Sequence, residues 1–289
     1  MSLIQLENKY LFLEISPEMG ASITRFLDKK LNQNIFRPFP NRKKIKNKNC
    51  YFSGYFLTVP YFGVIHKKTF LYKDKYISLA RTHPLEPDTI HGEGWINKWK
   101  IEKKSKASIN VSFTHSGKNS FPHKYQVYQK FSLYKKSLKI SVKLINLDQM
   151  SFYCGIGFHP WFNISDKSKI FANSFSYIKK IKNKYIAKQL TKKKSLDLNK
   201  FKVDSTFINW NGKSKLILSD DIKIEIINRK NINNLHVYSP PKEKFFCIEP
   251  VTNIGDSFRI AKNSSQYTGL KKIEKNKKFE ASVEFRLIN

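Results

Sequence analysis

Apolar and polar residues alternate with a period of two along most of this chain. The alternation is clearest in four segments, at residues 109–113, 125–131, 138–144 and 279–287. Successive side chains of a β-strand point to opposite faces of a sheet, so this period predicts strands that bury one face. The pattern therefore predicts that strands are the main element of the fold.

Shorter segments continue the same pattern. Residues 10–15, 235–238 and 245–249 have the composition of strands, and residues 215–226 indicate a hairpin. Convincing amphipathic helices are absent from the pattern, so we expect an all-β protein built as a large antiparallel β-sandwich. Without an internal repeat or a linker-like stretch, residues 1–289 are expected to form a single domain. Its most mobile insertions are predicted at residues 40–50 and 178–200.

Composition indicates a folded chain and favours a cytoplasmic location. With 289 residues, of which 40% are hydrophobic and 14% aromatic, the chain can bury a large core. No run of 18 uncharged apolar residues occurs, and the N-terminus lacks a basic segment followed by an apolar one. We therefore expect neither a membrane-spanning helix nor a secretory signal. Cys50, Cys154 and Cys247 are odd in number and widely spaced, which favours reduced thiols in a cytoplasmic protein.

The formal net charge of +32 has two interpretations. It could attract nucleic acid or an anionic membrane surface. It could also reflect biased residue usage, because lysine supplies most of the charge and rises together with asparagine and isoleucine. The densest basic runs, at residues 42–46, 179–182 and 192–194, lie between strand-like segments, where solvated loops are expected. Arginine is scarce and no nucleic-acid motif is recognised, so we expect no specific nucleic-acid or membrane partner, only weak attraction to polyanions at low salt.

Glu249 lies at the end of an apolar, aromatic run that begins at Phe245. Removing a carboxylate from water is costly unless a partner compensates, and a buried carboxylate has a raised pKa that suits proton abstraction near neutral pH. Alternation puts Phe245, Cys247 and Glu249 on one face of the strand. The simpler alternative is a strand end whose glutamate reaches solvent or pairs with a lysine.

His159 is the second candidate for proton transfer. Alternation places it on one face with Gly155 and Gly157, and two missing side chains predict a hollow beside the imidazole. Trp161 and Phe162 would supply flat apolar surface on which a sugar ring could lie. Histidine gives and takes a proton near pH 7 more readily than other side chains. The alternative is a histidine packed among aromatic residues.

Two further residues have weaker signals. His91 lies in a glycine-rich turn at residues 90–95 and could donate a hydrogen bond to an oxygen-rich substrate, or be a turn residue. Asp204 precedes a strand and by itself is typical of a turn. The other histidines are assigned structural positions: His66, His115 and His123 in solvated turns, His83 in a loop that leads to His91, and His236 as a packing residue. Asp256 either shapes a site wall or forms a turn.

Taken in order, these motifs resemble the aldose 1-epimerase (galactose mutarotase-like) family. The signature from Gly157 to Phe162 is the most specific match. The other matching elements are residues 15–23, His91-Gly92 followed by Trp95 and Trp99, residues 121–125, Asp204 with Phe207, and residues 238–241 leading into 247–252. The resemblance covers almost the whole chain.

The resemblance implies a large β-sandwich that interconverts the α and β anomers of an aldose. Glu249 would be the base and His159 the acid, His91 would bond the developing charge or a ring oxygen, and Asp204 would bind sugar hydroxyls. Such chemistry moves only protons, so no cofactor is expected. No metal is expected either, because the cysteine and histidine spacing is not that of a zinc site.

The chain also departs from the family pattern. Gly63 and Val64 stand where family members commonly carry an Asn-Arg pair, and an aliphatic side chain cannot replace the donors of arginine. Arg81 could compensate as a substrate-binding residue, or could lie on the surface. Three functions follow as alternatives: an epimerase of unphosphorylated aldoses, a hexose-6-phosphate epimerase with a basic pocket, or a carbohydrate-binding protein without catalysis. Pro160-Trp161 favours the first, and the sequence specifies neither the sugar nor the oligomeric state.

Overall fold

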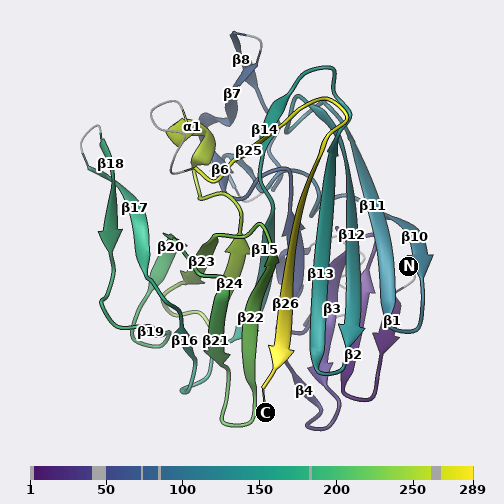
Figure 1. The fold of residues 1–289 in the computed structure, drawn as a ribbon, viewed down its shortest axis with the longest axis vertical. Coiled ribbons are helices and arrows are strands. Elements are labelled where there is room, and N and C mark those ends of the chain that lie inside the picture. The colour runs from purple at the N-terminus through teal and green to yellow at the C-terminus, as the bar shows by residue number, and fades with distance from the viewer. Residues whose placement is uncertain are drawn as a thin grey trace.

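Two large antiparallel β-sheets lie face to face and make up most of the molecule (Figure 1). The structure is a computed structural model that describes residues 3–40, 50–72, 74–83, 86–181, 184–261 and 268–288. Strands predominate throughout these ranges, so the prediction of an all-β antiparallel sandwich is confirmed. Within them, no helix combines the length and apolar character needed to cross a membrane.

The first sheet has eleven strands. In spatial order they are β1 (Ile4–Glu7), β2 (Leu11–Ser16), β3 (Ser22–Asp28), β5 (Tyr55–Thr58), β15 (Gly157–Asn163), β24 (Phe245–Val251), β23 (Asn234–Ser239), β20 (Val203–Ile208), β17 (Ser176–Ile181) and β18 (Lys184–Gln189), with β4 (Gln33–Asn34) paired to β3. Its central strands come from distant parts of the chain, which brings residues near 57, 159 and 249 together.

The second sheet has nine strands. In spatial order they are β10 (Lys100–Lys104), β11 (Ser108–Ser116), β12 (Lys124–Tyr134), β13 (Ser137–Asn146), β26 (Lys278–Leu287), β22 (Lys223–Lys230), β21 (Lys213–Ile217), β16 (Lys169–Phe171) and β19 (Ser195–Asp197). The hairpin predicted at residues 215–226 is confirmed as β21 and β22.

Smaller elements complete the fold. They are the pairs β6 (Val64–Ile65) with β9 (Thr89–Ile90), β7 (Thr69–Tyr72) with β8 (Lys75–Ser78) and β14 (Phe152–Cys154) with β25 (Lys271–Ile273), the helix α1 (Ser257–Ala261), and the 3-10 turns η2 (Cys50–Phe52) and η3 (His66–Lys68). Of these, β6, β7, β8, β14, β25 and α1 lie together at one end of the sandwich (Figure 1). Of the predicted mobile insertions, residues 41–49 lie outside the described ranges. Residues 178–200 contain most of the β17–β18 hairpin and β19, so the basic run at 179–182 begins within a strand and not in a loop.

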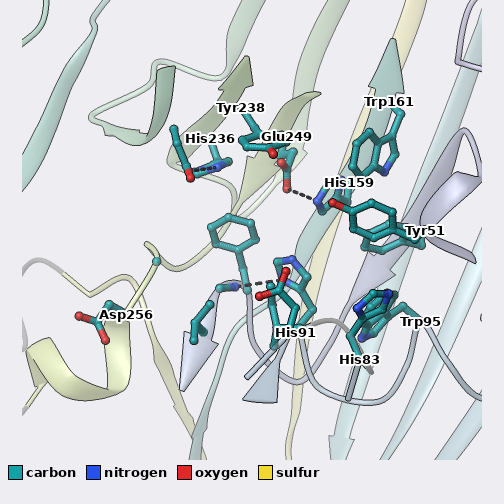
Figure 2. A pocket seen from close by; sticks show the side chains of 18 of the residues that line it. Tyr51, His83, His91, Trp95, His159, Trp161, His236, Tyr238, Glu249 and Asp256 are labelled. Carbon is teal, nitrogen blue, oxygen red and sulfur yellow. Dashed lines mark hydrogen bonds and ion pairs between the residues drawn. The ribbon is translucent and has the colours of Figure 1, made fainter. Parts of the chain in front are cut away.

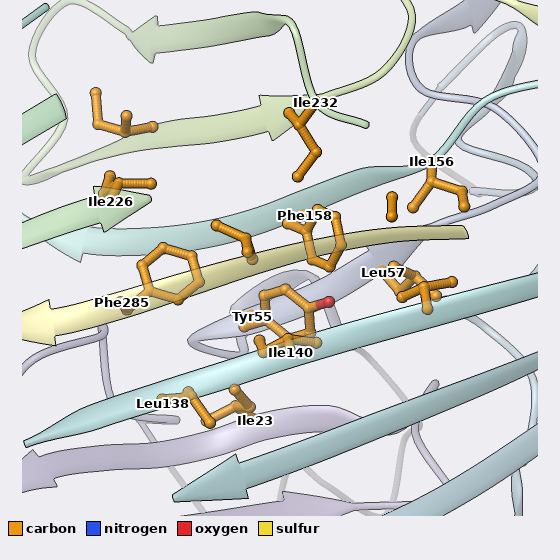
Figure 3. Close-up of a cluster of buried hydrophobic side chains, with 14 of the residues drawn as sticks. Ile23, Tyr55, Leu57, Leu138, Ile140, Ile156, Phe158, Ile226, Ile232 and Phe285 are labelled. Carbon is orange, nitrogen blue, oxygen red and sulfur yellow. The ribbon is translucent and has the colours of Figure 1, made fainter. Parts of the chain in front are cut away.

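The hydrophobic core fills the space between the two sheets (Figure 3). Leu57 and Phe158 of the first sheet point toward Ile140 and Phe285 of the second, and all four are buried. These positions alternate with residues that face the other way, as the period of two requires. The main core therefore occupies one face of strands β5, β15 and β24, and the opposite face carries a smaller buried cluster that includes Phe56, Trp161 and Cys247.

Strand register decides which residues meet on that opposite face. Gly157 pairs with Val251, and Trp161 pairs with Cys247, across β15 and β24. His159 and Glu249 lie midway between these pairs, so they occupy equivalent places on neighbouring strands. Because both alternate away from the core, their side chains emerge side by side.

Candidate active site

A cavity of about 550 Å³ opens on the face of the eleven-stranded sheet that points away from the core. Its lining comes from β5, β15, β20, β23 and β24 together with loops from both halves of the chain (Figure 2). Five of the residues predicted from sequence lie in this lining: His91, His159, Trp161, Asp204 and Glu249. Segments far apart in the sequence thus contribute to one concave site.

His159 and Glu249 form the deepest polar pair. The distance between His159 Nε2 and Glu249 Oε2 is 3.4 Å, and the exposed fractions of the two side chains are 8% and 1%. Among the described residues, Glu249 Oε2 and His159 Nδ1 have no hydrogen-bond partner. Unpaired buried polar atoms are uncommon in folded proteins, and a bound ligand is one of the explanations for them.

Burial shifts the two pKa values in opposite directions. Loss of water raises the pKa of Glu249 well above its ordinary value, and the Asp204 carboxylate raises it further. Loss of water lowers the pKa of His159 well below its ordinary value, with smaller contributions from His91 and His236. Both shifts favour uncharged side chains, so this pair is best described as one carboxyl–imidazole unit that shares a proton.

His91 is held as a neutral donor. Its Nδ1 accepts a hydrogen bond of 3.1 Å from the backbone N–H of Gly63, which leaves the ring proton on Nε2. Burial lowers the pKa of His91 to about 3, so the imidazole stays uncharged at neutral pH. The residue itself has a φ of 60°, and Gly92 beside it leaves no room for a Cβ next to Val59. This strained turn presents an N–H donor to the cavity.

His236 belongs to the site, although the sequence indicated a packing residue. Its Nε2 lies 3.3 Å from Asp204 Oδ1, and its Nδ1 lies 3.0 Å from Thr206 Oγ1. The hydrogen bond from His236 lowers the pKa of Asp204, whose side chain is 74% exposed at the rim. With both ring nitrogens engaged, His236 orients Asp204, and the carboxylate keeps lone pairs for hydroxyl groups.

Aromatic rings form the remaining wall. Trp161 stacks on His159 with ring centroids 5.0 Å apart and an interplanar angle of 18°. The Arg37 guanidinium covers Trp161 at 4.2 Å from the ring centroid. Phe162, expected beside Trp161 at the site, instead packs against Phe246 within the core, because adjacent residues of a strand face opposite sides.

The glycines before His159 do not leave a hollow for ligand, contrary to the sequence-based expectation. A Cβ on Gly155 would lie 1.9 Å from Asn253 Oδ1, and one on Gly157 would lie 2.3 Å from Thr58 Oγ1. Neighbouring protein side chains fill the space. These glycines therefore permit close packing around β15 and only indirectly support His159.

Sequence reasoning missed several residues of the cavity. Tyr51 and His83 approach from loops that carry no pattern, and His83 stacks on Trp95 at 5.5 Å. Tyr238 lies two residues after His236 on β23, so alternation places it on the same face of that strand as His236. His115 and His123 lie outside the site and are buried, each near a carboxylate, so the expectation of solvated turns was wrong.

Carboxylates supply the charge of the described cavity lining. Among the described residues that line it, none is lysine or arginine, whereas Glu86, Asp204, Glu249 and Asp256 are present. Ligating atoms of His159, Cys247 and Glu249 lie within 4.8 Å of one another and could hold a metal ion. However, burial and Glu249 raise the pKa of the Cys247 thiol well above its ordinary value, which disfavours the thiolate that a metal needs.

A profile of the aldose 1-epimerase family matches residues 2–286. The chain belongs to that family. It is 23% identical over 272 residues to the uncharacterized protein YphB of Escherichia coli K12. The aligned region covers 89% of this chain and 90% of YphB.

Solved structures agree on the fold. A galactose mutarotase-like protein from Clostridium acetobutylicum superposes with a TM-score of 0.83 at 20% identity, covering 99% of this chain and 95% of that one. A galactose mutarotase related enzyme from Lactobacillus acidophilus gives 0.81 at 16% identity, covering 100% and 98%. At these identities the likeness concerns the fold alone.

The sequence departs from the aldose 1-epimerase family pattern at the Asn-Arg pair, and the structure shows where the residues at those positions lie. Gly63 and Val64 line the cavity at the positions where the Asn-Arg pair was expected, and Gly63 supplies the backbone donor to His91. Arg81, the candidate replacement, is exposed and is not part of the lining. The structure therefore leaves apolar surface at Val64 and does not bring Arg81 to the other site residues.

Proposed function

We propose that this protein is an aldose 1-epimerase that acts on an unphosphorylated sugar. The observation that carries the proposal is the buried pair of His159 and Glu249, 3.4 Å apart in one cavity with hydrogen-bonding and aromatic walls. Such a pair supplies a proton donor and a proton acceptor within reach of the same small ring. The family relationship supports the same reaction type.

The reaction requires two coordinated proton movements. Glu249 as carboxylate accepts the proton of the anomeric hydroxyl, the C1–O5 bond breaks as C1 becomes an aldehyde, and O5 takes a proton from His159. Rotation about C1–C2 turns the aldehyde over, and closure with reversed roles gives the other anomer. His91 Nε2–H is the donor for the developing charge on oxygen, and Asp204 accepts hydrogen bonds from hydroxyl groups.

Burial favours the end point of ring opening and disfavours the form from which opening starts, and ring closure with reversed roles has the opposite balance. Ring opening converts the pair from carboxylate and imidazolium to carboxylic acid and neutral imidazole. Burial stabilises the neutral pair, because both charged forms lose water. Each positioned proton transfer contributes a factor of about 10²–10⁴ in rate.

The cavity lining favours a neutral sugar over a hexose phosphate. Phosphate recognition relies on arginine or lysine, and neither type is among the described residues of the lining. Glu86 and Asp256 would instead repel a phosphate dianion. Among the described residues, the lysine and arginine side chains are not part of the cavity lining.

Substitution of the proposed base tests the mechanism. We expect purified protein to accelerate the anomer exchange of glucose, galactose or another free aldose, followed by polarimetry or by NMR exchange. Glu249→Gln keeps the shape of the side chain and removes its basicity, so kcat should fall by at least about 10²-fold. Turnover unchanged in this variant would eliminate the mechanism.

Glu274→Gln is the matched control. Glu274 lies in the turn between β25 and β26, is exposed, pairs with Lys272, and is not part of the cavity lining. The same chemical change there should leave kcat and KM at wild-type values. Circular dichroism of both variants verifies that the fold persists.

A further inference from the structure

A second cavity, of about 810 Å³, adjoins the proposed catalytic cavity. The two share Val64, His66 and Asp256 in their linings. The second cavity extends along the small elements at one end of the sandwich, β6, β7, β8, β14 and α1 (Figure 1). The two cavities therefore lie side by side, with these three residues lining both.

Aromatic surface dominates the second cavity. Phe70, Tyr72 and Phe152 lie in its lining with Tyr76 and Tyr153, whose exposed fractions are 63% and 51%. Large apolar side chains exposed together on a surface mark a binding site. The tyrosines also carry hydroxyl groups, so this surface offers flat apolar faces with polar edges.

Polar groups concentrate at the junction of the two cavities. His66 Nδ1 lies 3.1 Å from Asp88 Oδ2, and His66 Nε2 lies 3.7 Å from Asp256 Oδ1. An oxygen-rich chain that passes from one cavity to the other would meet these groups. Lys67 and Asp256 in the second cavity have opposite charges, so the lining does not select a strongly charged ligand.

We propose that the second cavity binds the additional ring or rings of a reducing saccharide whose terminal aldose occupies the catalytic cavity. A pyranose ring has apolar faces and hydroxyl-bearing edges, which match aromatic walls with polar rims. Because Val64, His66 and Asp256 line both cavities, a second ring attached through a non-anomeric hydroxyl of the first would lie next to this surface. This inference rests on the proposed epimerase function and extends it to the substrate class.

Anomer exchange of disaccharides tests the inference. Maltose, cellobiose, lactose and isomaltose attach the second ring to different hydroxyls, and glucose is the single-ring reference. We expect kcat/KM for one or more of these disaccharides to exceed that of glucose. Tyr153→Ala and Tyr76→Ala should lower kcat/KM for the preferred disaccharide by roughly threefold to tenfold, and leave glucose unchanged, because each removes one stacking contact.

Tyr134→Ala is the matched control. Tyr134 is an exposed tyrosine of β12 that lines neither cavity, so its removal should change neither substrate. Disaccharide rates no higher than those of glucose, or equal losses for both substrates in the two test variants, would overturn the inference.

A binding measurement separates this inference from the proposed reaction. Calorimetric titration of the Glu249→Gln variant with the same sugars needs no turnover. Tighter binding of a disaccharide than of glucose, reduced by Tyr153→Ala, supports the second subsite even if no aldose is converted. Equal affinity for disaccharide and glucose in that variant counts against the subsite, whether or not the wild-type protein is active.

Discussion

At the scale of single residues, the site depends on groups kept uncharged by burial. Glu249 has a raised pKa and His159 a lowered one, mainly because both have lost contact with water. His91 is neutral for the same reason and is fixed as a donor by Gly63. A pocket with neutral donors and acceptors suits a substrate that is itself neutral and rich in hydroxyl groups.

The shared proton predicts a bell-shaped dependence of kcat/KM on pH. Activity requires one proton on the His159–Glu249 pair. As pH falls, His159 gains a second proton only below its lowered pKa, so the acid limb should lie below pH 6.5, the ordinary value for histidine. As pH rises, Glu249 loses the last proton only above its raised pKa, so the alkaline limb should lie well above 4.5.

The profile is measured as anomer exchange across pH with the uncatalysed rate subtracted at each point. The two apparent pKa values belong to the pair and not to single residues. An acid limb centred at or above 6.5 would contradict a buried neutral imidazole. The Glu249→Gln variant should lack the bell in its residual activity.

At the scale of elements, close packing between strands holds His159 in place. Gly157 lies two residues before it on β15, against Thr58 of β5. Thr58 Oγ1 also donates a hydrogen bond of 3.2 Å to the Gly157 carbonyl. The glycine is needed because the side chains of Thr58, Phe62 and Val251 occupy the space that a Cβ would take.

We expect Gly157→Ala to lower the free energy of unfolding by about 1–3 kcal/mol, because the new methyl group overlaps Thr58 Oγ1. Thr58→Ala alone should cost about 1 kcal/mol through the lost hydrogen bond. Together the two changes should cost less than their sum, since the second substitution removes the clash. Urea denaturation of the single and double variants gives the comparison, and strictly additive losses would refute the packing explanation.

At the scale of the whole molecule, the described basic residues that give the chain its positive charge are not part of the cavity lining. The chain has a formal net charge of +32, yet the cavity lining described above contains no lysine or arginine. Lys179 and the three lysines at 192–194 are exposed, and none of them is part of the lining. Long-range attraction to anions is screened within about 8 Å at physiological salt, so local groups decide which substrate binds.

We therefore expect glucose 6-phosphate to be a poorer substrate than glucose at physiological ionic strength, by at least about tenfold in kcat/KM. The phosphate would meet Glu86, Asp204 or Asp256, and the described residues of the lining offer it no lysine or arginine. The two sugars are compared by NMR exchange, with each uncatalysed rate as its own reference. A preference for the phosphate would show that basic groups outside the described lining reach the substrate.

The sequence alone determined the all-β class and the faces of individual strands. Alternation separated Phe158 from His159 and Ile248 from Glu249, because strand geometry allows only two directions for successive side chains. Ordered motifs also indicated the family that the whole-chain match shows. These features are local or follow chain order, so no knowledge of pairing between strands was needed.

Only the tertiary structure decided which faces meet. The register of β15 against β24, about 90 residues later, sets the 3.4 Å separation of His159 and Glu249. The pairing of β23 with β24 brings His236 beside Glu249, Asn253 fills the space next to Gly155, and Arg81 lies outside the cavity lining. Contacts between distant segments depend on how both sheets fold and pack, and a single-strand pattern contains no information about its partner.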